Sequence, residues 1–309
     1  MVHLPVLLQE TVTRLVTEPG GWYVDGTVGL GGHAAAVLAA AGLDAHLLGL
    51  DRDGQALELA RDALEPFGDR VILERANFSD LRAVADRHGI QSVRGVLLDL
   101  GVSSPQLDRA ERGFSFRHDS PLDMRMDDRQ DLTAARLLAE QPPRELALLL
   151  RRYGEEPAAR RIAAAVAAAR AHGEPLETTT QLAELVARVK GGRRGRIHPA
   201  TQTFQALRIA VNDELGALAA GRPAALDLLA PGGRLAVISF HSLEDRMVKR
   251  FMADHVGRME SLAKGGERWA GQLPRARRVT HKPVVASEQE IAVNPRARSA
   301  KLRVMERMA

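Results

Sequence analysis

The stretch GWYVDGTVGLGGHAAAVLAAAG, residues 21–42, decides the fold of this 309-residue chain. An apolar run of strand length ends at Asp25, a turn rich in glycine follows, and an alanine-rich helical segment ends at Gly42. Such a turn brings backbone N–H groups and a helix N-terminus up to a ligand, because no side chains block the approach. The stretch therefore predicts the first strand–turn–helix unit of a ligand-binding α/β domain.

Further apolar runs of strand length recur along the chain, and each of the first four is followed by a segment typical of a helix or loop. They lie near Trp22–Asp25, His46–Asp51, Val71–Glu74, Gly95–Asp99 and Leu235–Phe240. This alternation predicts a mostly parallel, Rossmann-like α/β sheet. The segment 297–308 alternates as a last strand does, antiparallel at the sheet edge, and the weakly periodic stretch around Arg258 to Arg278 predicts a mobile loop.

About 130 residues separate the fourth and fifth strands, although a crossover with its helix needs only a few dozen. Helical segments fill this interval, beginning after Thr133, at Pro143, at Pro157 and near Thr179. The sequence thus predicts one domain from residues 1–112 and 208–309, with an inserted small helical domain over 113–207.

A long helical pattern leads out of the insert. Residues 198–221 are typical of one continuous helix, with apolar positions at helical spacing on one face. Those positions, which we expect in the core, are Phe204, Leu207, Val211, Leu215 and Leu218.

Composition narrows the class of protein. The chain has no cysteine, which excludes disulfides, Cys-ligated zinc, iron–sulfur clusters and cysteine nucleophiles.

The net charge of +4 divides into −8 over residues 1–132 and +12 over 133–309. A basic half indicates a polyanionic partner, with a solvated arginine-rich surface as the alternative. The N-terminus lacks a signal-peptide pattern and no apolar run approaches the roughly 20 residues of a membrane span, so we expect a cytoplasmic protein.

A carboxylate completes the expected ligand site. Asp51 ends the second strand, 26 residues after Asp25, where it can accept hydrogen bonds from both hydroxyls of a ribose. The pattern Gly29-x-Gly31-x-x-Ala34 also fits a dinucleotide, so NAD stays open as the cofactor. Asp25, placed four residues before Gly29, favours S-adenosylmethionine, because an acid at this strand end suits the ammonium group of that cofactor.

Two more strand ends point to the same region. Phe78 follows the third strand and Asp99 ends the fourth, and ligands of open sheets lie beyond the carboxyl ends of the strands. We therefore expect Asp99 and the turn after it at the reaction centre. Phe78 has two interpretations, a ring stacked on adenine or an ordinary core residue.

Longer blocks carry a family resemblance. Seven blocks of the sequence closely resemble the MraW/RsmH family of bacterial ribosomal RNA methyltransferases. The three most informative are DGTVGLGGH (25–33), DLGVSSPQLDRAERGFSFRHDSPLDMRMD (99–127) and PGGRLAVISFHSLEDRMVKRF (231–251). The other four are HLPVLLQE, YGEE, HPATQTFQALRIAVNDEL and NPRARSAKLRVMER. The blocks occur in order over nearly the whole chain. The resemblance implies a class I methyltransferase fold, S-adenosylmethionine as cofactor, and methylation of N4 of one cytidine in the decoding centre (P-site region) of 16S ribosomal RNA, within the small ribosomal subunit.

The resemblance also implies residue roles. The cofactor set combines Asp25 and Gly29, from the pattern above, with the positions that the family assigns to cofactor contact: Gly31, Gly32, His33, Asp51, Phe78, Asp99 and Gln106. By itself His33 is typical of an ordinary residue at a helix start; the family places it at the cofactor through its backbone.

Methylation of a cytosine amine requires a hydrogen-bond acceptor in the active site. The N4 amine of cytosine is a poor nucleophile, so positioning and a hydrogen-bond acceptor against its N–H should dominate catalysis. Asp99 is one candidate for that acceptor; the other is that Asp99 holds the methionine end of the cofactor while Ser103 or Ser104 lies nearer the base. Methylation at carbon 5 of a pyrimidine requires a thiolate, which this chain lacks.

RNA contacts are expected at Asp123 and Arg125 in the charged loop after the active-site turn, in the insert at Arg193, Arg194 and Arg196, and along the basic C-terminal region from Arg246 onward. A solvated loop is the alternative for the first pair. We assign no metal, because the spacing of His198, His241, Glu244 and Asp245 fits no standard site.

Two other functions stay open from the residues alone. One is an NAD-dependent oxidoreductase, for which His33 and His241 are candidate general acids. The other is a noncatalytic ribosome-assembly factor that retains the fold, which the intact Gly29–His33 turn and Asp51 disfavour.

Overall fold

A computed structural model describes residues 4–192, 198–261, 266–270 and 273–309. The chain divides into two compact units, residues 1–101 with 216–309, and residues 102–215. The sequence placed these boundaries after residues 112 and 207, so the turn after the fourth strand and most of the long helical return belong to the smaller unit. No described helix is both long and apolar enough to cross a membrane.

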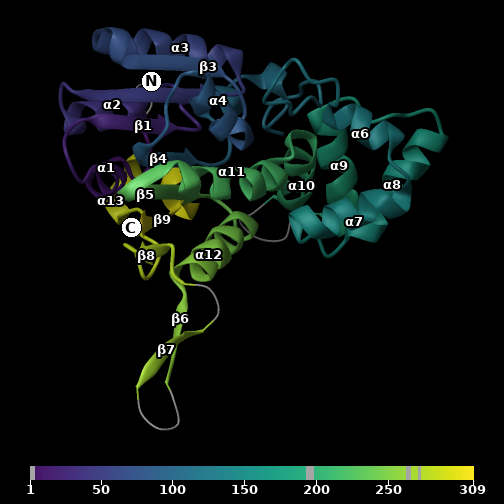
Figure 1. The fold of residues 1–309 in the computed structure, drawn as a ribbon. Helices are drawn as coiled ribbons and strands as arrows, with labels where there is room; N and C mark the ends of the chain where they lie inside the picture. Colours follow the sequence, from purple (N-terminus) through teal and green to yellow (C-terminus); the bar gives the residue numbers. More distant parts are fainter. Residues whose placement is uncertain (1–3, 193–197, 262–265, 271–272) are drawn as a thin grey trace. The chain divides into compact units, whose positions relative to one another are not determined.

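The larger unit is built on a seven-stranded sheet with the strand order β3-β2-β1-β4-β5-β9-β8 (Figure 1). The first five strands in this order are parallel, and β9 is antiparallel to both of its neighbours. The strands are β1 (Gly21–Asp25), β2 (Ala45–Asp51), β3 (Val71–Arg75), β4 (Val93–Asp99), β5 (Leu229–Ser239), β8 (Ala276–Arg278) and β9 (Lys301–Arg307). The predicted mostly parallel sheet is confirmed.

The C-terminal part of the sheet differs from the prediction. β9 is antiparallel as expected, but β8 pairs with it on the far side, so β9 is not the edge strand. The segment predicted as a loop contains β8 together with the hairpin of β6 (Arg258–Ser261) and β7 (Glu267–Ala270). Strands of three or four residues are too short to show a period of two in the sequence, because the alternation needs several positions to stand out.

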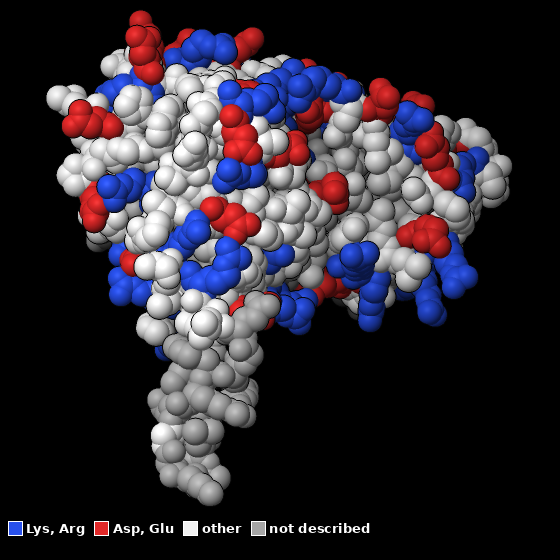
Figure 2. Space-filling view, in the orientation of Figure 1, with Lys and Arg blue, Asp and Glu red and all other residues white. Residues whose placement is uncertain are grey.

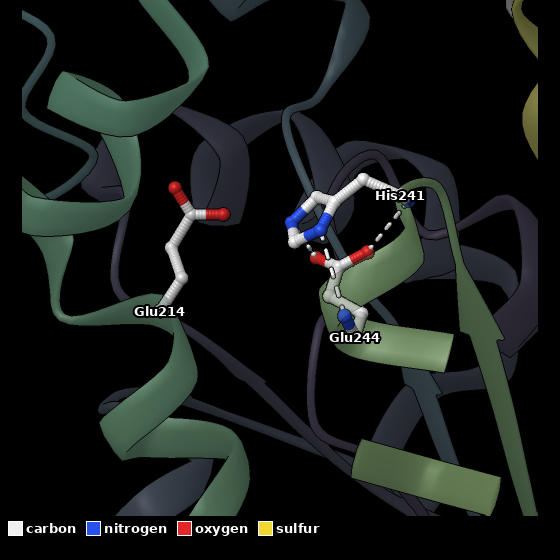
Figure 3. Close-up of side chains that lie close together, drawn as sticks. All are labelled: Glu214, His241 and Glu244. Carbon is white, nitrogen blue, oxygen red and sulfur yellow. Dashed lines mark hydrogen bonds and ion pairs between the residues drawn. The ribbon is translucent and has the colours of Figure 1, made fainter. Parts of the chain in front are cut away.

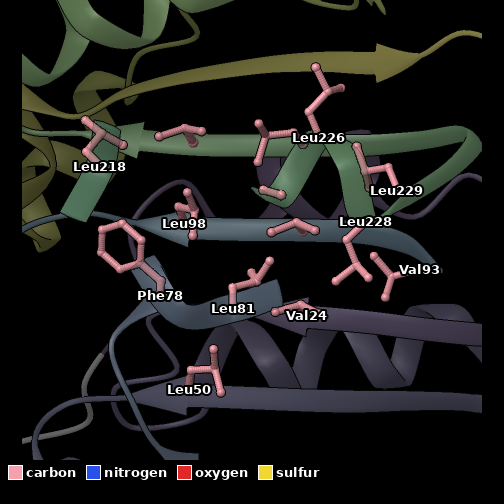
Figure 4. Close-up of a cluster of buried hydrophobic side chains, with 14 of the residues drawn as sticks. Val24, Leu50, Phe78, Leu81, Val93, Leu98, Leu218, Leu226, Leu228 and Leu229 are labelled. Carbon is pink, nitrogen blue, oxygen red and sulfur yellow. The ribbon is translucent and has the colours of Figure 1, made fainter. Parts of the chain in front are cut away.

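Helices cover both faces of this sheet, as the alternation of buried side chains requires. Val24 and Leu98 point into one apolar cluster with helices α4, α11 and α12, whereas Tyr23 and Leu97 point into the other with α1, α2 and α3. Figure 4 shows part of the first cluster. The helices of this unit are α1 (Leu8–Leu15), α2 (Gly32–Ala41), α3 (Gly54–Leu64), α4 (Leu81–Arg87), α11 (Glu214–Leu228), α12 (Ser242–Val256) and α13 (Glu288–Val293), with 3-10 turns η1 (Glu65–Arg70), η2 (Phe78–Asp80) and η4 (Pro295–Ser299).

The smaller unit is helical, with its own apolar core. Its caps follow the sequence, since the Thr133 side chain accepts the N–H of Arg136 and Thr178 accepts that of Gln181. Its helices are α5 (Ser104–Asp108), η3 (Ala110–Arg112), α6 (Ala134–Glu140), α7 (Pro143–Gly154), α8 (Ala159–Ala171), α9 (Thr179–Lys190) and α10 (Thr201–Asn212).

The predicted continuous helix over 198–221 is interrupted. Asp213 has a φ of 45°, in the left-handed region, and separates α10 from α11. Phe204, Leu207 and Val211 are in the core of the smaller unit, whereas Leu218 is in a core of the larger one. The apolar face read as one stripe therefore serves two separate cores, and Leu215, at the break, is only half-buried.

A buried amide next to this break holds the charged loop after the active-site turn. Asn212 is 3% exposed, its Oδ1 accepts the N–H of Met126 at 2.7 Å, and its Nδ2 donates to the carbonyl of Met124 at 2.7 Å. Met124 has a φ of 63°, so these hydrogen bonds stabilise a backbone conformation that non-glycine residues seldom adopt.

We expect Asn212→Ala to lower the free energy of unfolding by about 2–4 kcal/mol, because each buried polar group left without a partner costs about 1–3 kcal/mol. Chemical denaturation followed by circular dichroism measures this. Gln205→Ala is the matched control: its amide donates to the Tyr153 carbonyl at 3.1 Å from a half-buried position, and we expect a loss below about 1 kcal/mol. Equal losses in the two variants would contradict the role given to Asn212.

Candidate functional site

Three neighbouring strands each end in a carboxylate at the same edge of the sheet. β2, β1 and β4 are adjacent in the sheet, and they end at Asp51, Asp25 and Asp99. Carboxyl groups brought together in a region of low water content repel one another and are poorly solvated, so each favours its protonated form unless a cation is present. This edge is the place that the sequence predicted for the reaction centre.

Asp25 is 2% exposed. Burial raises the pKa of Asp25 to about 7, the nearby Asp51 adds to the increase, and the N–H of Thr27, which donates to Asp25 Oδ1 at 3.1 Å, opposes it. The hydroxyl of Thr27 in turn accepts the N–H of Asp99 at 2.7 Å. Thr27 thus ties together two of the three strand ends, a role that the sequence analysis missed.

Asp51 fixes the glycine-rich turn. Its Oδ2 accepts the N–H of Gly29 at 2.9 Å and its Oδ1 accepts the N–H of Asp53 at 2.9 Å. Burial raises the pKa of Asp51 to about 6 against these hydrogen bonds. Each carboxylate oxygen keeps a lone pair for a further donor, so binding the turn leaves the predicted ribose contacts possible. This local turn could have been predicted from Asp51 and Asp53 at the start of the βα connection, because aspartate side chains commonly accept the backbone N–H two residues later.

The turn itself is closely packed. Gly29 and Gly31 have φ values of 53° and 81°, where a side chain would be strained. A Cβ at Gly32 would lie 2.5 Å from Cγ of Pro5. The N-terminal segment therefore packs directly on the turn, which explains why Gly32 and the block HLPVLLQE belong to one site although they are far apart in the sequence.

His33 begins the helix after this turn, and its side chain is 6% exposed. Its Nε2 lies 3.0 Å from the carbonyl oxygen of Val6, and because a carbonyl can only accept, Nε2 carries the proton in this contact. Nδ1 then faces Asp99 Oδ2 at 3.6 Å. The sequence assigned His33 to the site through its backbone, whereas the structure also brings its ring to Asp99.

Asp99 is the most unusual group of the site. Burial, together with the carboxylates of Asp25 and Glu244, raises its pKa well above the ordinary value. Its Oδ1 is buried and no described residue gives it a hydrogen bond. A buried polar atom without a partner in the protein is typical of a site that a ligand completes.

Phe78 is a core residue in this structure. Its ring is 6% exposed and belongs to the apolar cluster of Figure 4. A Cβ at Gly221 would lie 2.6 Å from its Cδ2, so the ring packs against the backbone of α11. The core interpretation of Phe78 fits this position, and the cofactor contact at this residue stays a prediction.

The residues after β4 lie in the smaller unit. Gln106, a predicted cofactor contact, is 5% exposed, and its Oε1 accepts the N–H of Ser103 at 3.0 Å at the start of α5. Ser103 Oγ is buried and has no hydrogen-bond partner among the described residues. Ser104 begins α5, and its side chain lies outside the described part.

The predicted RNA-binding residues fall into two groups. Arg125 donates to both oxygens of Asp123, at 2.8 and 2.7 Å, and to the carbonyl of Gln130 at 2.7 Å. Burial opposes ionisation of Asp123, but the hydrogen bonds from Arg125 outweigh it and hold the pKa of Asp123 below its ordinary value. The two side chains therefore stabilise their own loop. Arg193, Arg194 and Arg196 lie outside the described residues.

The His241 and Glu244 side chains close the start of α12. Glu244 Oε2 accepts the N–H of Phe240 at 2.8 Å. Figure 3 shows the two side chains in contact: Glu244 Oε2 accepts the N–H of His241 at 3.2 Å, and His241 Nε2 lies 3.1 Å from Glu244 Oε1. Asp245 pairs with Arg303 of β9 at 2.7 Å. These contacts give the HSLED block a structural role in joining α12 to the sheet.

The arrangement fits a cationic nucleoside ligand. The carboxyl group of Asp25 offers negative charge that a cation would stabilise, Asp99 offers a buried acceptor oxygen, Asp51 can accept hydroxyl donors, and the turn at Gly29–Gly32 permits close backbone approach. S-adenosylmethionine combines an ammonium and a sulfonium with a ribose, so the donor set matches that cofactor. NAD carries no ammonium group for the buried acids.

Comparison with known proteins gives a full-length match. A model described as the MraW methylase family matches residues 1–308. A protein named ribosomal RNA small subunit methyltransferase H, from Symbiobacterium thermophilum, is 51% identical over 319 residues, covering 98% of this chain and 96% of its own. The protein of that name from Geobacter sulfurreducens is 50% identical over 308 residues, covering 99% of each chain.

Solved structures give distant similarities. An rRNA methylase from Streptococcus thermophilus has a TM-score of 0.43 at 12% identity, covering 100% of this chain and 99% of its own. A SAM-dependent O-methyltransferase from Thermotoga maritima has a TM-score of 0.41 at 9% identity, covering 100% of this chain and 67% of its own.

The raised pKa of Asp25 predicts a pH-dependent stability. The folded protein holds the Asp25 proton more tightly than the unfolded chain, with a pKa of about 7 against 3.8. This contribution to stability is complete below pH of about 4 and is lost as the pH rises through about 7. Asp25→Asn cannot ionise, and its Oδ1 can still accept the N–H of Thr27.

We therefore expect the ligand-free Asp25→Asn protein to melt at nearly the same temperature as the wild type near pH 4 and on the order of 10 °C higher near pH 8. One pKa unit corresponds to about 1.4 kcal/mol, and large domains change their Tm by about 2–4 °C per kcal/mol. Thermal melts across this pH range measure the difference. Parallel pH profiles of the two proteins would show that Asp25 is ionised at low cost in the folded state.

Proposed function

This chain belongs to the MraW methylase family and is an S-adenosylmethionine-dependent methyltransferase, and from this premise we propose that it methylates N4 of one cytidine in the decoding centre of 16S ribosomal RNA, within the small ribosomal subunit. The observation that carries the choice of an amine is Asp99 Oδ1, a buried acceptor with no partner among the described residues. The relatives at 50–51% identity bear the name ribosomal RNA small subunit methyltransferase H, which supports RNA as the substrate.

Family membership sets aside the NAD-dependent oxidoreductase that the glycine pattern alone left open. A noncatalytic assembly factor is disfavoured by the site, because Asp51 still fixes the glycine turn and Asp99 keeps an acceptor oxygen that no described residue satisfies. The absence of cysteine excludes the thiolate that methylation at carbon 5 of a pyrimidine requires. An exocyclic amine and a hydroxyl both agree with these observations, and the resemblance to the family selects the amine.

The reaction requires a weak nucleophile to be held in line with an electrophilic methyl group. S-adenosylmethionine, when bound, supplies that methyl on a sulfonium. We propose that Gly29, Gly31 and Gly32 bring the backbone to the cofactor, that Asp51 accepts the ribose hydroxyls, and that Asp25 faces the ammonium. These contacts position the cofactor, and positioning accounts for much of the acceleration of a displacement of this kind.

Asp99 and His33 then act on the amine. We propose that the Asp99 carboxyl is protonated at Oδ2, toward His33 Nδ1, which leaves Oδ1 to accept an N–H of the cytidine amine. When the methyl group leaves the sulfonium sulfur and bonds to the amine, the nitrogen would become more acidic, and its proton would pass to Asp99 Oδ1 while the Oδ2 proton would pass to His33 Nδ1. Val6 holds the ring in the required orientation through Nε2. The 3.6 Å separation of His33 and Asp99 would shorten on binding, as catalytic contacts commonly do.

RNA recognition is proposed for the smaller unit and for the C-terminal part of the chain. From Arg246 onward the sequence has 15 basic and 6 acidic residues, and arginine suits phosphate contacts because its planar group donates in pairs. The predicted contacts at Arg193, Arg194 and Arg196 remain part of this proposal, as do Asp123 and Arg125, whose pairing would have to open to reach RNA.

The product identifies the reaction. Purified protein, 16S ribosomal RNA or small subunits, and methyl-labelled cofactor should place the label in N4-methylcytidine after digestion to nucleosides and mass spectrometry. A target base inside a duplex must first be unstacked, at a cost of a few kcal/mol, so subunits and naked RNA can differ in rate but not in product. Label in 5-methylcytidine or in a 2′-O-methyl ribose would overturn the assignment, and no transfer to either substrate would favour the noncatalytic alternative.

Asp99 should matter for turnover more than for folding. We expect Asp99→Ala to lower kcat at least about 100-fold at saturating cofactor, as the loss of one preorganised polar partner commonly does. Asp99→Asn keeps an acceptor oxygen but cannot take up the amine proton, so it separates positioning from proton transfer. If Asp99→Asn equals the wild type while Asp99→Ala is slow, the proton relay is wrong; if both retain full kcat, Asp99 is not the acceptor.

A further inference from the structure

One face of α7 combines two arginines with apolar positions. Arg144, Ala147, Leu148 and Arg151 follow the spacing i, i+3, i+4, i+7, which places them on one side of the helix. Both arginines are exposed, and Leu148 is 56% exposed. A large apolar side chain left in water between two charges has no role in the core of the smaller unit.

The next helix offers a matching face. Pro157 precedes α8, and Arg160, Arg161 and Ala164 continue the same i, i+3, i+4, i+7 spacing from it. These residues and the face on α7 line one groove of about 860 Å³, whose further lining residues are Pro143, Ala158 and Ala159. The groove lies wholly within the smaller unit, and its four charged side chains are all arginines.

The charge of this groove is uncompensated. Arg144, Arg151, Arg160 and Arg161 make no hydrogen bond or ion pair with any described residue. By contrast, Arg136 pairs with Glu140 and Arg208 with Glu214, both at 2.7 Å. In Figure 2 basic side chains project from the surface over α7.

The acids of these helices do not cancel that charge. Glu156 is fully buried and pairs with Lys190 at 2.9 Å. Glu145 and Glu155 are exposed but are not among the lining residues. The groove thus presents four free guanidinium groups beside an apolar floor.

We propose that this groove binds a single-stranded segment of the RNA substrate, apart from the nucleotide that is methylated. The proposal rests on the proposed function, because it takes the ligand to be ribosomal RNA. Arginine donors fit phosphates, and guanidinium planes and exposed apolar side chains pack on unstacked bases. An acidic peptide would satisfy the charges but would give no use to the exposed Leu148.

Phosphate contacts and base contacts in the groove affect the salt dependence of RNA binding differently. Removing a phosphate contact lowers affinity and also lowers the salt dependence of binding, by about 0.7 in slope per contact for a single strand. Removing a base contact lowers affinity and leaves that slope unchanged, because no counterion is involved. The two kinds of variant therefore test the charges and the floor separately.

The test uses the full-length protein and a fluorescein-labelled single-stranded fragment of 16S ribosomal RNA, with fluorescence anisotropy over a range of salt concentrations. We expect Arg160→Gln with Arg161→Gln to weaken binding at least about 10-fold and to lower the slope by about 1.4. Leu148→Ser should weaken binding several-fold with the slope unchanged. Thermal melts and cofactor titration verify that each variant folds.

Matched controls remove the same groups elsewhere. Arg82 and Arg136 are exposed arginines that pair with Asp86 and Glu140, so the variant with both changed to Gln loses the same charge outside the groove. Leu43, 85% exposed in the larger unit, is the control for Leu148. The controls should bind RNA as the wild type does.

The outcomes separate this proposal from the proposed function. If the wild type methylates N4 of cytidine but the groove variants and the controls bind RNA equally well, the groove proposal is wrong and the function stands. If the groove variants bind RNA normally but lose binding to a poly-glutamate peptide, an acidic protein is the partner. If the wild type methylates nothing, the proposed function fails, and the anisotropy difference between groove and control variants still decides whether RNA binds here.

Discussion

The larger unit depends on the placement of three carboxylates at adjacent strand ends. Parallel pairing of β2, β1 and β4 puts Asp51, Asp25 and Asp99 at one edge, where burial raises all three pKa values and repulsion between neighbouring strand ends adds to the increase at Asp25 and Asp99. A fold selected only for stability would not gather buried acids in this way. The cost becomes useful when a cation binds, because the same charges that destabilise the ligand-free protein then stabilise the complex.

The surrounding structure keeps these acids in fixed positions. Thr27 joins the ends of β1 and β4, and Asp51 joins the end of β2 to the glycine turn. Pro5 and Val6 cover that turn from outside, so the His33 ring is orientated by a backbone carbonyl. Each contact restrains a group that would otherwise relax away from its neighbours, which is how a rigid scaffold supports a strained site.

The smaller unit combines a separate apolar core with a surface groove lined by arginines. Its core is apolar and separate, and a buried amide at Asn212 sets the loop that carries Asp123 and Arg125. Arg136 and Arg208 are paired with acids, whereas the four groove arginines on α7 and α8 make no ion pair with any described residue. Free positive charge beside exposed apolar surface is stable in water but suits an anionic, flat-faced ligand better.

The sequence by itself determined the features that depend on local pattern. Strand periodicity, the acids that end three strands, the glycine turn and the cap at Thr133 could all be predicted, because each depends on residues within a few positions of one another. The full-length family resemblance supplied the cofactor. The short strands β6–β8 left no such pattern.

Only the tertiary structure decided the contacts between distant segments. It placed the Phe78 ring in the core, brought Val6 to His33, left Asp99 Oδ1 without a partner among the described residues and broke the long helix at Asp213. The sequence shows which side chains share a face, but which neighbour that face meets is set by the packing of the whole unit. The partner of a buried polar atom is therefore not encoded at its own position.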